Sequence, residues 1–339
     1  MKKTVFFGAL TVAGLAAGMA SAATLDDVKA RGSLNCGVTT GLVGFAAPNA
    51  EGVWEGFDVG VCRAVAAAIF GDPTAVEFVP TTGQTRFTAL ASGEIDLLAR
   101  NTTWTMSRDV DLKFEFVGVN YYDGQGFMVP KALGVTSAKD LDGATVCIQT
   151  GTTTELNLAD FFRTNNISYE PVPIETNAEA QQQYLAGACD VYTTDASGLA
   201  ATRATFEAPA DHVLLPEIIS KEPLGPLVRH GDNEWGDIAR WTLNALVTAE
   251  ELGVTSANVE ELSAAAGDNP EVNRLLGTEG ELGAMLGLEA DWAKNAIMAG
   301  GNYGELFENN IGENTTIGLA RGLNAQWTDG GLIYSPPFR

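Results

Sequence analysis

The first half of the chain alternates short apolar runs with segments in which apolar residues recur every three or four positions. A short apolar run predicts a buried strand, whereas the longer spacing predicts a helix with one buried face. In chain order, the predicted strands and helices cover residues 34–38, 58–70, 76–79, 85–91 and 95–99. Asp58 is placed to cap the first helix and Gly71 to end it. This order is typical of a parallel sheet with helices on its faces.

The same order recurs further along the chain. Strands are predicted at 144–149, 169–173 and 190–194, and helices at 155–163 and 178–185. Two extended stretches, residues 116–130 and 214–225, enter and leave this second unit, and we interpret them as paired crossovers between two lobes. From about Asp237 the chain is predicted to be helical, with glycine interruptions, and we expect this part to cap one lobe.

The predicted fold class is therefore α/β, with two parallel-sheet lobes joined by two crossover strands. A chain of 339 residues is large for one core, which also favours two domains. The predicted divisions are a signal peptide at 1–22, the first part of lobe I at 23–122, lobe II at 123–218, and a return to lobe I with a C-terminal helical extension at 219–339.

The N-terminal residues have the three parts of a secretory signal peptide. Lys2 and Lys3 are basic, an uncharged apolar stretch follows, and Ala20 and Ala22 form an A-x-A cleavage site. A membrane anchor is the alternative, but the apolar run is short and ends in small residues. No cysteine follows the site, which argues against a lipidated N-terminus. We therefore predict cleavage after Ala22 and export of a soluble protein to the periplasm.

The charge of the chain limits its partners. Its formal net charge is −23, and the predicted signal peptide carries no acidic residue. Binding to nucleic acid or anionic lipid needs a basic face, so neither partner is expected. An anionic ligand would have to bind in a local cationic pocket of an acidic protein.

Four cysteines are present: Cys36, Cys62, Cys147 and Cys189. Their spacing fits no zinc site, and an oxidising compartment favours two disulfides, for which three pairings exist. If a hinge divides the chain near residue 120, only Cys36–Cys62 with Cys147–Cys189 keeps both bonds within a lobe. We favour that pairing, with buried free thiols as the alternative.

Open parallel sheets bind ligands beyond the carboxyl ends of their strands. The segments that follow predicted strands here are residues 39–45, 101–108 and 150–154, and Asp195. If two sheets face each other with these ends inward, the segments line one cleft between the lobes.

The chemistry of these segments indicates an amino acid. Arg108 can hold a carboxylate through two parallel hydrogen bonds, and Asn101 and Thr103 can add donors. Thr152 and Thr153 lie at a predicted helix N-terminus, where free N–H groups also favour an anion.

Asp195 supplies the complementary charge, a carboxylate suited to an ammonium group. An arginine and an aspartate on opposite sides of a cleft match the two ends of an α-amino acid. Phe87 or Trp104 can pack against its aliphatic part or its ammonium.

Each of these residues also has a purely structural interpretation. Arg108 can pair with Asp109 or Asp111 on the surface. Asp195 can serve only as a helix cap, and Trp104 can pack at the rim of the cleft without touching a ligand.

Four stretches of the sequence together resemble the periplasmic polar amino-acid-binding proteins of ABC importers. They are GFDVGVCRAVAAAIFGD, RFTALASGEIDLLARNTTWTMSRD, DLDGATVCIQTGTTTELNLADFF and TTDASGLAA. The chain is most similar to the general L-amino-acid-binding branch, whose members bind glutamate, glutamine, aspartate and asparagine. The resemblance covers most of the chain after the signal peptide, including the end in SPPFR. It implies the type II periplasmic-binding-protein fold, in which two lobes close around a ligand.

The resemblance also implies residue roles. The carboxylate-binding arginine falls on Arg108 and the ammonium-binding aspartate on Asp195. The strand-end donors, the stacking aromatic and the second-lobe threonines fall on Asn101, Thr103, Phe87, Thr153 and Thr152. Where narrower relatives have an acid and an aromatic, this chain has Thr39 and Leu42, which argues against a cationic amino acid as the best ligand. Weaker candidates for side-chain selection are Gln149, Arg86 and Arg100.

The predicted function is therefore the capture of L-amino acids with polar, acidic or amide side chains and their delivery to an inner-membrane ABC permease. No cofactor, metal or catalytic residue is expected, and the family implies a monomer. The first alternative is an enzyme on the same fold, such as a dehydratase, but His212 and His230 are the only histidines and neither lies in a predicted cleft segment. The second is an amino-acid-sensing ligand module, which would normally be joined to a membrane span.

Overall fold

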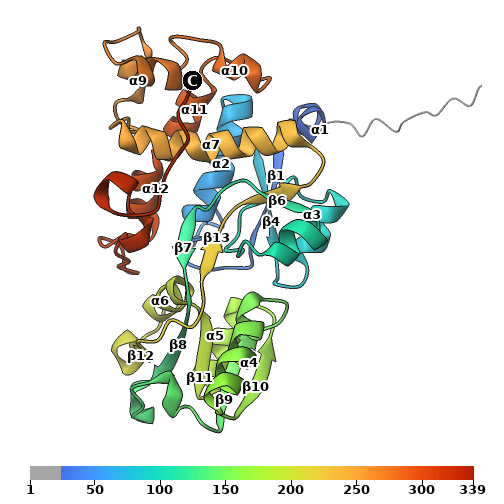
Figure 1. Cartoon of the computed structure of the whole chain (residues 1–339), viewed down its shortest axis with the longest axis vertical. Coiled ribbons are helices and arrows are strands. Elements are labelled where there is room, and N and C mark those ends of the chain that lie inside the picture. The colour runs from blue at the N-terminus through green and yellow to red at the C-terminus, as the bar shows by residue number, and fades with distance from the viewer. Residues whose placement is uncertain (1–23) are drawn as a thin grey trace, which may run out of the picture.

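The computed structural model describes residues 24–339, so the predicted signal peptide lies outside the described residues. The chain forms two lobes stacked end to end (Figure 1). Each lobe contains one five-stranded sheet, with the orders β4-β1-β5-β14-β6 and β10-β9-β11-β8-β12. We call the part that contains β1 lobe I and the part that contains β9 lobe II.

Lobe I is built mainly from the first third of the chain. Its strands are β1 (Leu34–Thr39), β4 (Val76–Thr81), β5 (Leu97–Leu98), β6 (Phe114–Phe116) and β14 (Leu227–Arg229). Its first helices are α1 (Thr24–Arg31), α2 (Phe57–Phe70) and α3 (Arg86–Ser92), and β2 (Ala47–Pro48) and β3 (Trp54–Glu55) form a small separate pair.

Lobe II repeats this order of strands and helices. Its strands are β8 (Gln125–Pro130), β9 (Ala144–Gln149), β10 (Tyr169–Ile174), β11 (Val191–Asp195) and β12 (His212–Leu214). Its helices are α4 (Thr153–Asn165), α5 (Asn177–Leu185) and α6 (Ala196–Ala204). The prediction of two α/β lobes is confirmed.

Both sheets are mixed rather than wholly parallel. β1 is parallel to β4 and β5, and β9 is parallel to β10 and β11. β14 and β8 run antiparallel to their neighbours. The prediction of parallel sheets was wrong for these strands because each follows a crossover. A chain that enters a lobe from the cleft starts at the carboxyl ends of the parallel strands and must run against them.

Two short strands connect the lobes. β7 (Tyr121–Asp123) pairs antiparallel with β13 (Glu222–Leu224), and they run side by side between the lobes in Figure 1. They lie within the two stretches predicted to cross over. Because these two strands are the only connections between the sheets within residues 24–339, the lobes can rotate about them.

The C-terminal third is helical and packs on lobe I. It contains α7 (Asn233–Glu251), α8 (Val259–Ser263), α9 (Pro270–Leu275), α10 (Leu282–Met285), α11 (Trp292–Met298) and α12 (Tyr303–Asn310). One apolar core joins this part to α2, and Phe57 packs edge-on against Tyr303 and Phe307. The expected capping role is therefore observed for lobe I. No described helix is long and apolar enough to cross a membrane.

The start of α2 differs from the prediction. Gly56, with φ 130°, precedes the helix, and Asp58 lies inside the first turn as a buried residue. A Cβ at Gly56 would lie 2.3 Å from the Phe45 carbonyl oxygen, so only glycine fits this turn. Asp58 was expected to cap the helix because its type favours that position, but the turn at Gly56 moves the helix start past it.

The cysteine pairing is confirmed. Cys36 on β1 is bonded to Cys62 on α2, and Cys147 on β9 is bonded to Cys189 just before β11. Each bond stays within one lobe, so neither restricts rotation at the crossover.

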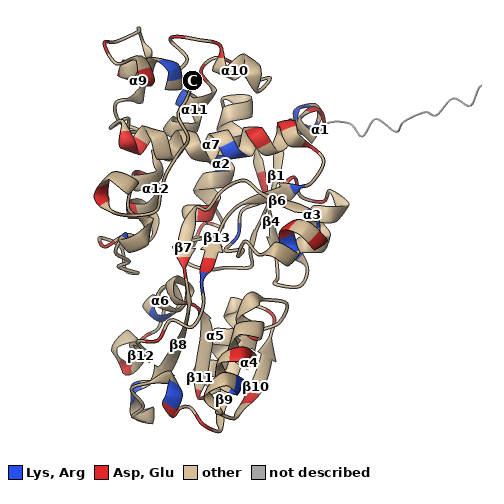
Figure 2. Cartoon of the chain, viewed as in Figure 1, with Lys and Arg blue, Asp and Glu red and all other residues tan. Residues whose placement is uncertain are grey.

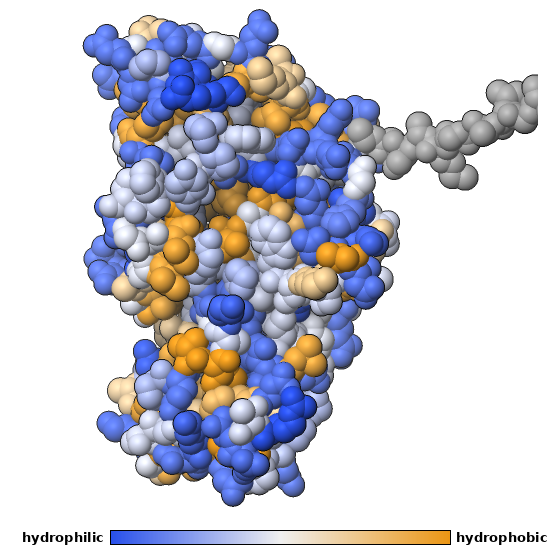
Figure 3. Space-filling model, in the orientation of Figure 1, coloured by the Kyte–Doolittle hydropathy of each residue, from blue (hydrophilic) through white to orange (hydrophobic). Residues whose placement is uncertain are grey.

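Charged and apolar residues are mixed over the surface. Basic residues are scattered among acidic ones in the described chain and form no continuous face in the view of Figure 2. Exposed apolar side chains are likewise interspersed with hydrophilic ones on the face shown in Figure 3.

Candidate functional site

The carboxyl ends of the parallel strands of both lobes meet at one cavity beside the crossover. Residues after β5 line it from lobe I, and residues from the end of β9, the start of α4 and the end of β11 line it from lobe II. The lining residues are Arg86, Arg100, Asn101, Thr103, Gln149, Thr152, Thr153, Thr154, Thr194 and Asp195. Eight of these ten were predicted site residues, and Thr154 and Thr194 were not.

The lobes are in direct contact across this cavity. Asn101 donates from Nδ2 to Asp195 Oδ2 at 3.2 Å, and Gln84 donates from Nε2 to Thr150 Oγ1 at 2.7 Å. A third contact between the lobes joins Asn177 of lobe II, which donates from Nδ2, to the Gly41 carbonyl of lobe I at 3.1 Å. The structure therefore represents a closed arrangement of the cleft.

Three buried arginines gather on the lobe I side. Arg86, Arg100 and Arg108 are all nearly inaccessible to solvent. Burial lowers the pKa of Arg100 and of Arg108 to about 10, and it lowers the pKa of Arg86 strongly. Among the described residues, no carboxylate lies within ion-pairing distance of any of them. Buried cations are normally paired, so this side of the cavity is suited to an anion.

The hydrogen bonds of these arginines leave donors free. Arg108 donates to the Thr103 carbonyl at 2.8 Å, and Arg86 donates to Thr102 Oγ1 at 3.1 Å. Arg86 Nε is buried and has no partner. The expected alternative for Arg108, a pair with Asp109 or Asp111, is not formed among the described residues. Asp109 instead accepts from the Trp104 indole at 2.8 Å and lies 3.6 Å from His230.

Buried carboxyl groups lie on the opposite side. Burial raises the pKa of Asp195 well above its usual value, and the nearby acids Asp123 and Glu222 raise it further. Burial also raises the pKa of Asp123 to about 6, although Ser197 donates to it. Asp195 precedes α6 but makes no capping hydrogen bond. Among the described residues, no cation lies within ion-pairing distance of Asp195, so this buried carboxyl group is suited to an ammonium ligand.

The start of α4 places a group of hydroxyls in the cavity. The helix begins at Thr153, two residues earlier than predicted, because the Thr152 side chain accepts from the Glu155 N–H and caps it. Thr153 Oγ1 lies 3.1 Å from Thr103 Oγ1 of lobe I. Threonines from both lobes therefore meet beside the arginines.

Three predicted site residues, Arg108, Phe87 and Trp104, lie outside the cavity lining. Phe87 stacks on Phe114, and both Arg86 and Arg108 lie over its ring, at 4.8 and 5.1 Å. Trp104 is 40% exposed and stacks on Phe116, so it lies at the rim.

The two positions at which this chain departs from narrower relatives are both buried. Thr39 contacts Asn177 at 3.5 Å, and Leu42 belongs to the core of lobe I. Neither lines the cavity.

Sequence reasoning missed Glu222 and Asp123, the two acids of the crossover pair that lie against the site. They face each other in the register of β7 and β13. Along the chain, Glu222 is only an acid next to Pro223 in an extended stretch, which is also typical of a solvent-exposed connector. The pairing of β7 with β13 is what shows that it is buried beside the site.

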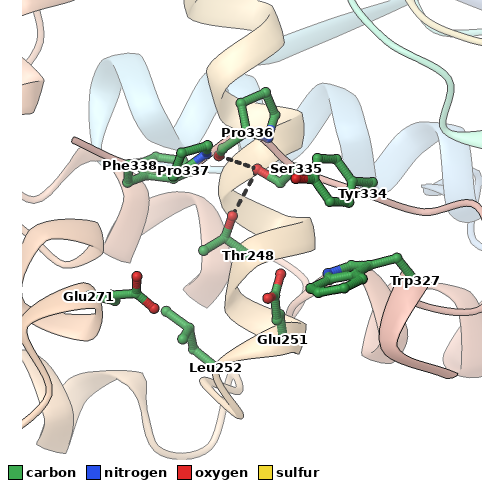
Figure 4. Close-up of a pocket in the computed structure, with 10 residues that line it drawn as sticks. All are labelled: Thr248, Glu251, Leu252, Glu271, Trp327, Tyr334, Ser335, Pro336, Pro337 and Phe338. Atoms are coloured by element: carbon green, nitrogen blue, oxygen red, sulfur yellow. Dashed lines mark hydrogen bonds between the residues drawn. The ribbon is translucent and has the colours of Figure 1, made fainter.

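A larger hollow of about 170 Å3 lies at the far end of lobe I, between α7 and the C-terminal tail (Figure 4). It is lined by Glu251, Glu271 and Trp327 among others, and Thr248 donates to Ser335 at its wall. No arginine and no strand end of a parallel sheet contributes to its lining. Its chemistry therefore does not match the two ends of an amino acid.

Comparison with known proteins gives the family. The family model for bacterial extracellular solute-binding proteins, family 3, matches residues 34–257. Over the whole length of both chains, this chain is 68% identical to the glutamate/glutamine/aspartate/asparagine-binding protein BztA of Rhodobacter capsulatus. It is 57% identical, again over both whole chains, to the general L-amino acid-binding periplasmic protein AapJ of Rhizobium johnstonii.

A solved structure agrees with this match. An ABC transporter periplasmic binding protein of Brucella ovis, with glutathione bound, has a TM-score of 0.91 and 57% identity, and the match covers 94% of this chain and 100% of that one. The two-lobed architecture, the cleft at the strand ends and these similarities agree. The chain belongs to the bacterial extracellular solute-binding proteins of family 3.

Proposed function

We propose that this chain captures L-amino acids in the cleft between its lobes and delivers them to an ABC permease. The observation that carries the proposal is the presence of opposite charges in one cavity. Arg86 and Arg100 line it together with Asp195, and Arg108 is buried nearby over the Phe87 ring. Among the described residues, none of the three arginines has a carboxylate within ion-pairing distance. An α-amino acid satisfies both sides at once, since its carboxylate pairs with an arginine and its ammonium with the aspartate. The names of the relatives BztA and AapJ support the same ligand class.

The proposed roles follow the residue types. Arg108 and the Asn101–Thr103 segment bind the α-carboxylate together with Thr152 and Thr153, and Asp195 binds the ammonium. Phe87 holds two of the arginines through its ring, and its stacking contact with a ligand stays a prediction.

A preference for acidic and amide side chains is supported by the cavity donors that the α-carboxylate of the ligand does not use. Arg108 suffices for one carboxylate, while Arg86 with its free Nε, Arg100 and Gln149 remain at the cavity. A second carboxylate or a side-chain amide can use these donors. The ligands named for BztA are of this kind.

Capture works by closure. The hydrogen bonds between the lobes exist only when the cleft is shut, and a ligand that bridges both lobes adds its own contacts to that state. Binding therefore shifts the population toward the closed form, which the permease can distinguish from the open one.

The alternative of an enzyme is not favoured, because the family and the relatives named here are solute-binding proteins. The two histidines also lie away from the cavity lining. His212 packs against Phe206 and contacts Tyr184, and His230 lies near Asp109.

We also propose the finer points of organisation: export to the periplasm with cleavage after Ala22, lobe boundaries at 122/123 and 218/219, and a monomer. Mass spectrometry of the exported protein and a sedimentation measurement test the first and the last.

The test of the function is calorimetry of the purified protein, freed of bound ligand, against the twenty amino acids and glutathione. Stoichiometric binding of several polar or acidic amino acids is the expected result. Arg108→Ala should then weaken binding more than a hundredfold, because it leaves a desolvated carboxylate without its cation. Arg163→Ala is the matched control, since Arg163 is exposed on α4 away from the cavity. A loss of less than tenfold at Arg108 contradicts its role, and no binding of any amino acid contradicts the function.

A further inference from the structure

Glu222 is a buried carboxylate on the crossover strand β13 that joins side chains from around the cleft. It is 1% exposed. Its Oε1 accepts from Asn157 Nδ2 at 2.6 Å and from Ser220 Oγ at 2.7 Å. Its Oε2 accepts from Thr153 Oγ1 at 3.0 Å and from Thr103 Oγ1. Four donors therefore hold one carboxylate at the hinge.

The donors on Oε2 are two of the residues proposed to bind the ligand's carboxylate. Thr103 lies beyond β5 in lobe I, and Thr153 is the first residue of α4 in lobe II. Both line the cavity. The position that Glu222 Oε2 occupies is thus chemically the position of a carboxylate ligand, supplied by the protein itself.

The number of hydroxyl protons limits how many of these contacts can be hydrogen bonds. The oxygens of Thr103, Thr153 and Glu222 all lie within hydrogen-bonding distance of one another, and the two hydroxyls carry only two protons for these three contacts. The carboxylate is the strongest acceptor of the three, so both hydroxyls donate their hydrogen bonds to it. The two hydroxyls then present only lone pairs to the cavity, and lone pairs repel a carboxylate.

The charge of Glu222 also acts on the arginines. It is among the charges that raise the pKa of Arg108 and of Arg86 against the effect of burial. No ion pair joins Glu222 to either arginine among the described residues, so the attraction acts at longer range. Glu222 therefore attracts the same cations that a ligand carboxylate needs.

We propose that Glu222 is an internal carboxylate that competes with the α-carboxylate of the amino acid for the hydroxyl protons of Thr103 and Thr153. This inference rests on the proposed function. On binding, the hydroxyl protons turn from Glu222 to the ligand, while Asn157 and Ser220 keep Glu222 in place. Each amino acid gains less from the two hydroxyls than it would without Glu222. The competition lowers affinity, which suits a protein that must release its ligand to a permease.

The test is Glu222→Gln, which keeps the shape of the side chain. Asn157 and Ser220 donate to the position of Oε1, so the glutamine oxygen is expected there and its NH2 group at the position of Oε2. The NH2 group donates to both threonine oxygens and frees both hydroxyl protons for the ligand. We expect the dissociation constant of L-glutamate to fall at least fivefold. The α-amide of glutamate, which lacks the α-carboxylate, should change less than twofold.

Glu217→Gln is the matched control, because Glu217 is a glutamate outside the cavity that accepts from Ser137 and the Ala138 N–H. It removes the same charge and should leave both dissociation constants unchanged. Glu222→Met, of similar volume and without charge, should shift L-glutamate in the same direction and serves if the glutamine variant does not fold.

Three results overturn the inference. They are an unchanged or weaker affinity for L-glutamate in a folded Glu222 variant, an equal gain for the α-amide, and an equal gain in Glu217→Gln. If the wild-type protein binds no amino acid at all, the proposed function fails and this inference fails with it. If the wild type binds L-glutamate and the variants gain nothing, only the role of Glu222 is refuted.

Discussion

Closure of the cleft depends on Gly83, which lies at the edge of lobe I that contacts lobe II. We call the two facing edges of the cleft its lips. Gly83 lies just before α3, against the turn that precedes α4 in lobe II. A Cβ at Gly83 would lie 2.6 Å from the Thr150 carbonyl oxygen and 3.1 Å from Thr152 Cγ2. Because the nearest atom belongs to the backbone, it cannot turn aside. Gly83→Ala therefore forces the lips apart in the closed form and meets no such obstacle when the lobes are open.

These contacts give the size of the free-energy cost that Gly83→Ala adds to the closed state. A Cβ needs roughly 3.4 Å of separation from a neighbouring atom, so the lips must part by several tenths of an ångström. Adding a methyl group to a well-packed contact costs about 1–3 kcal/mol. The parting also stretches the Gln84–Thr150 hydrogen bond of 2.7 Å, and a bond of this type contributes about 1 kcal/mol. Together these contributions weaken the closed state by about 1–4 kcal/mol, which corresponds to roughly 5- to 900-fold weaker ligand binding.

Calorimetry gives the dissociation constant, and stopped-flow displacement gives the rate of ligand release, which should rise in proportion. Gly267→Ala is the matched control, since a Cβ there meets nothing nearer than 3.9 Å, from Asn273 Oδ1. The unfolding temperature of ligand-free Gly83→Ala should match that of the wild type. Binding within twofold of the wild type would falsify the argument that this lip must close for tight binding.

Three further predictions concern buried charges. Burial raises the pKa of Asp195, whereas a ligand ammonium favours its ionised form, so ligand binding should release a larger fraction of a proton as the pH falls. Calorimetry in buffers of different ionisation enthalpy measures the number of protons released. Asp195→Asn should release none, and an unchanged release in that variant would contradict the assignment. Burial raises the pKa of Asp58 from 3.8 to about 7, so the folded state retains a proton that the unfolded state loses, and stability is lost as pH rises between about 4 and 7. Asp58→Asn should therefore stabilise the protein by up to about 4 kcal/mol at pH 8 and by little at pH 4, as urea unfolding will show, and an equal gain at both pH values would exclude this cause. Arg86→Gln should weaken binding of glutamate at least tenfold more than binding of glutamine, and equal losses would mean that Arg86 does not meet the side chain.

Local patterns were enough to predict most individual elements. The strand over Ala144–Gln149 has the predicted bounds, because its apolar run is short and ends at a turn of hydroxyl residues. The start of α4 was placed two residues late, since several consecutive threonines could each act as the cap. Asp58 was misplaced for a related reason: the preference of its residue type was outweighed by a turn that only Gly56 can make.

The cavity was predictable to the extent that its residues follow strands. Asn101, Thr103 and Asp195 follow predicted strands, and parallel strands bring their carboxyl ends to one edge. Arg86 was a weak candidate because it lies in a helix, and nothing in its neighbourhood along the chain indicates that it is buried without a partner. Its importance follows only from the atoms around it.

The sequence by itself determined the two α/β units, the residues at their strand ends and the opposite charges expected to bind an amino acid, and it favoured the in-lobe cysteine pairing only if a hinge divides the chain. These follow from short-range periodicity and residue chemistry, which act between near neighbours in the chain. The tertiary structure alone decided the strand directions next to each crossover, the contact of Gly83 with lobe II, and the place of Glu222 between Thr103 and Thr153. Thr103 and Glu222 are 119 positions apart and form a hydrogen bond only because the chain folds back along β7 and β13, and no local pattern records that contact.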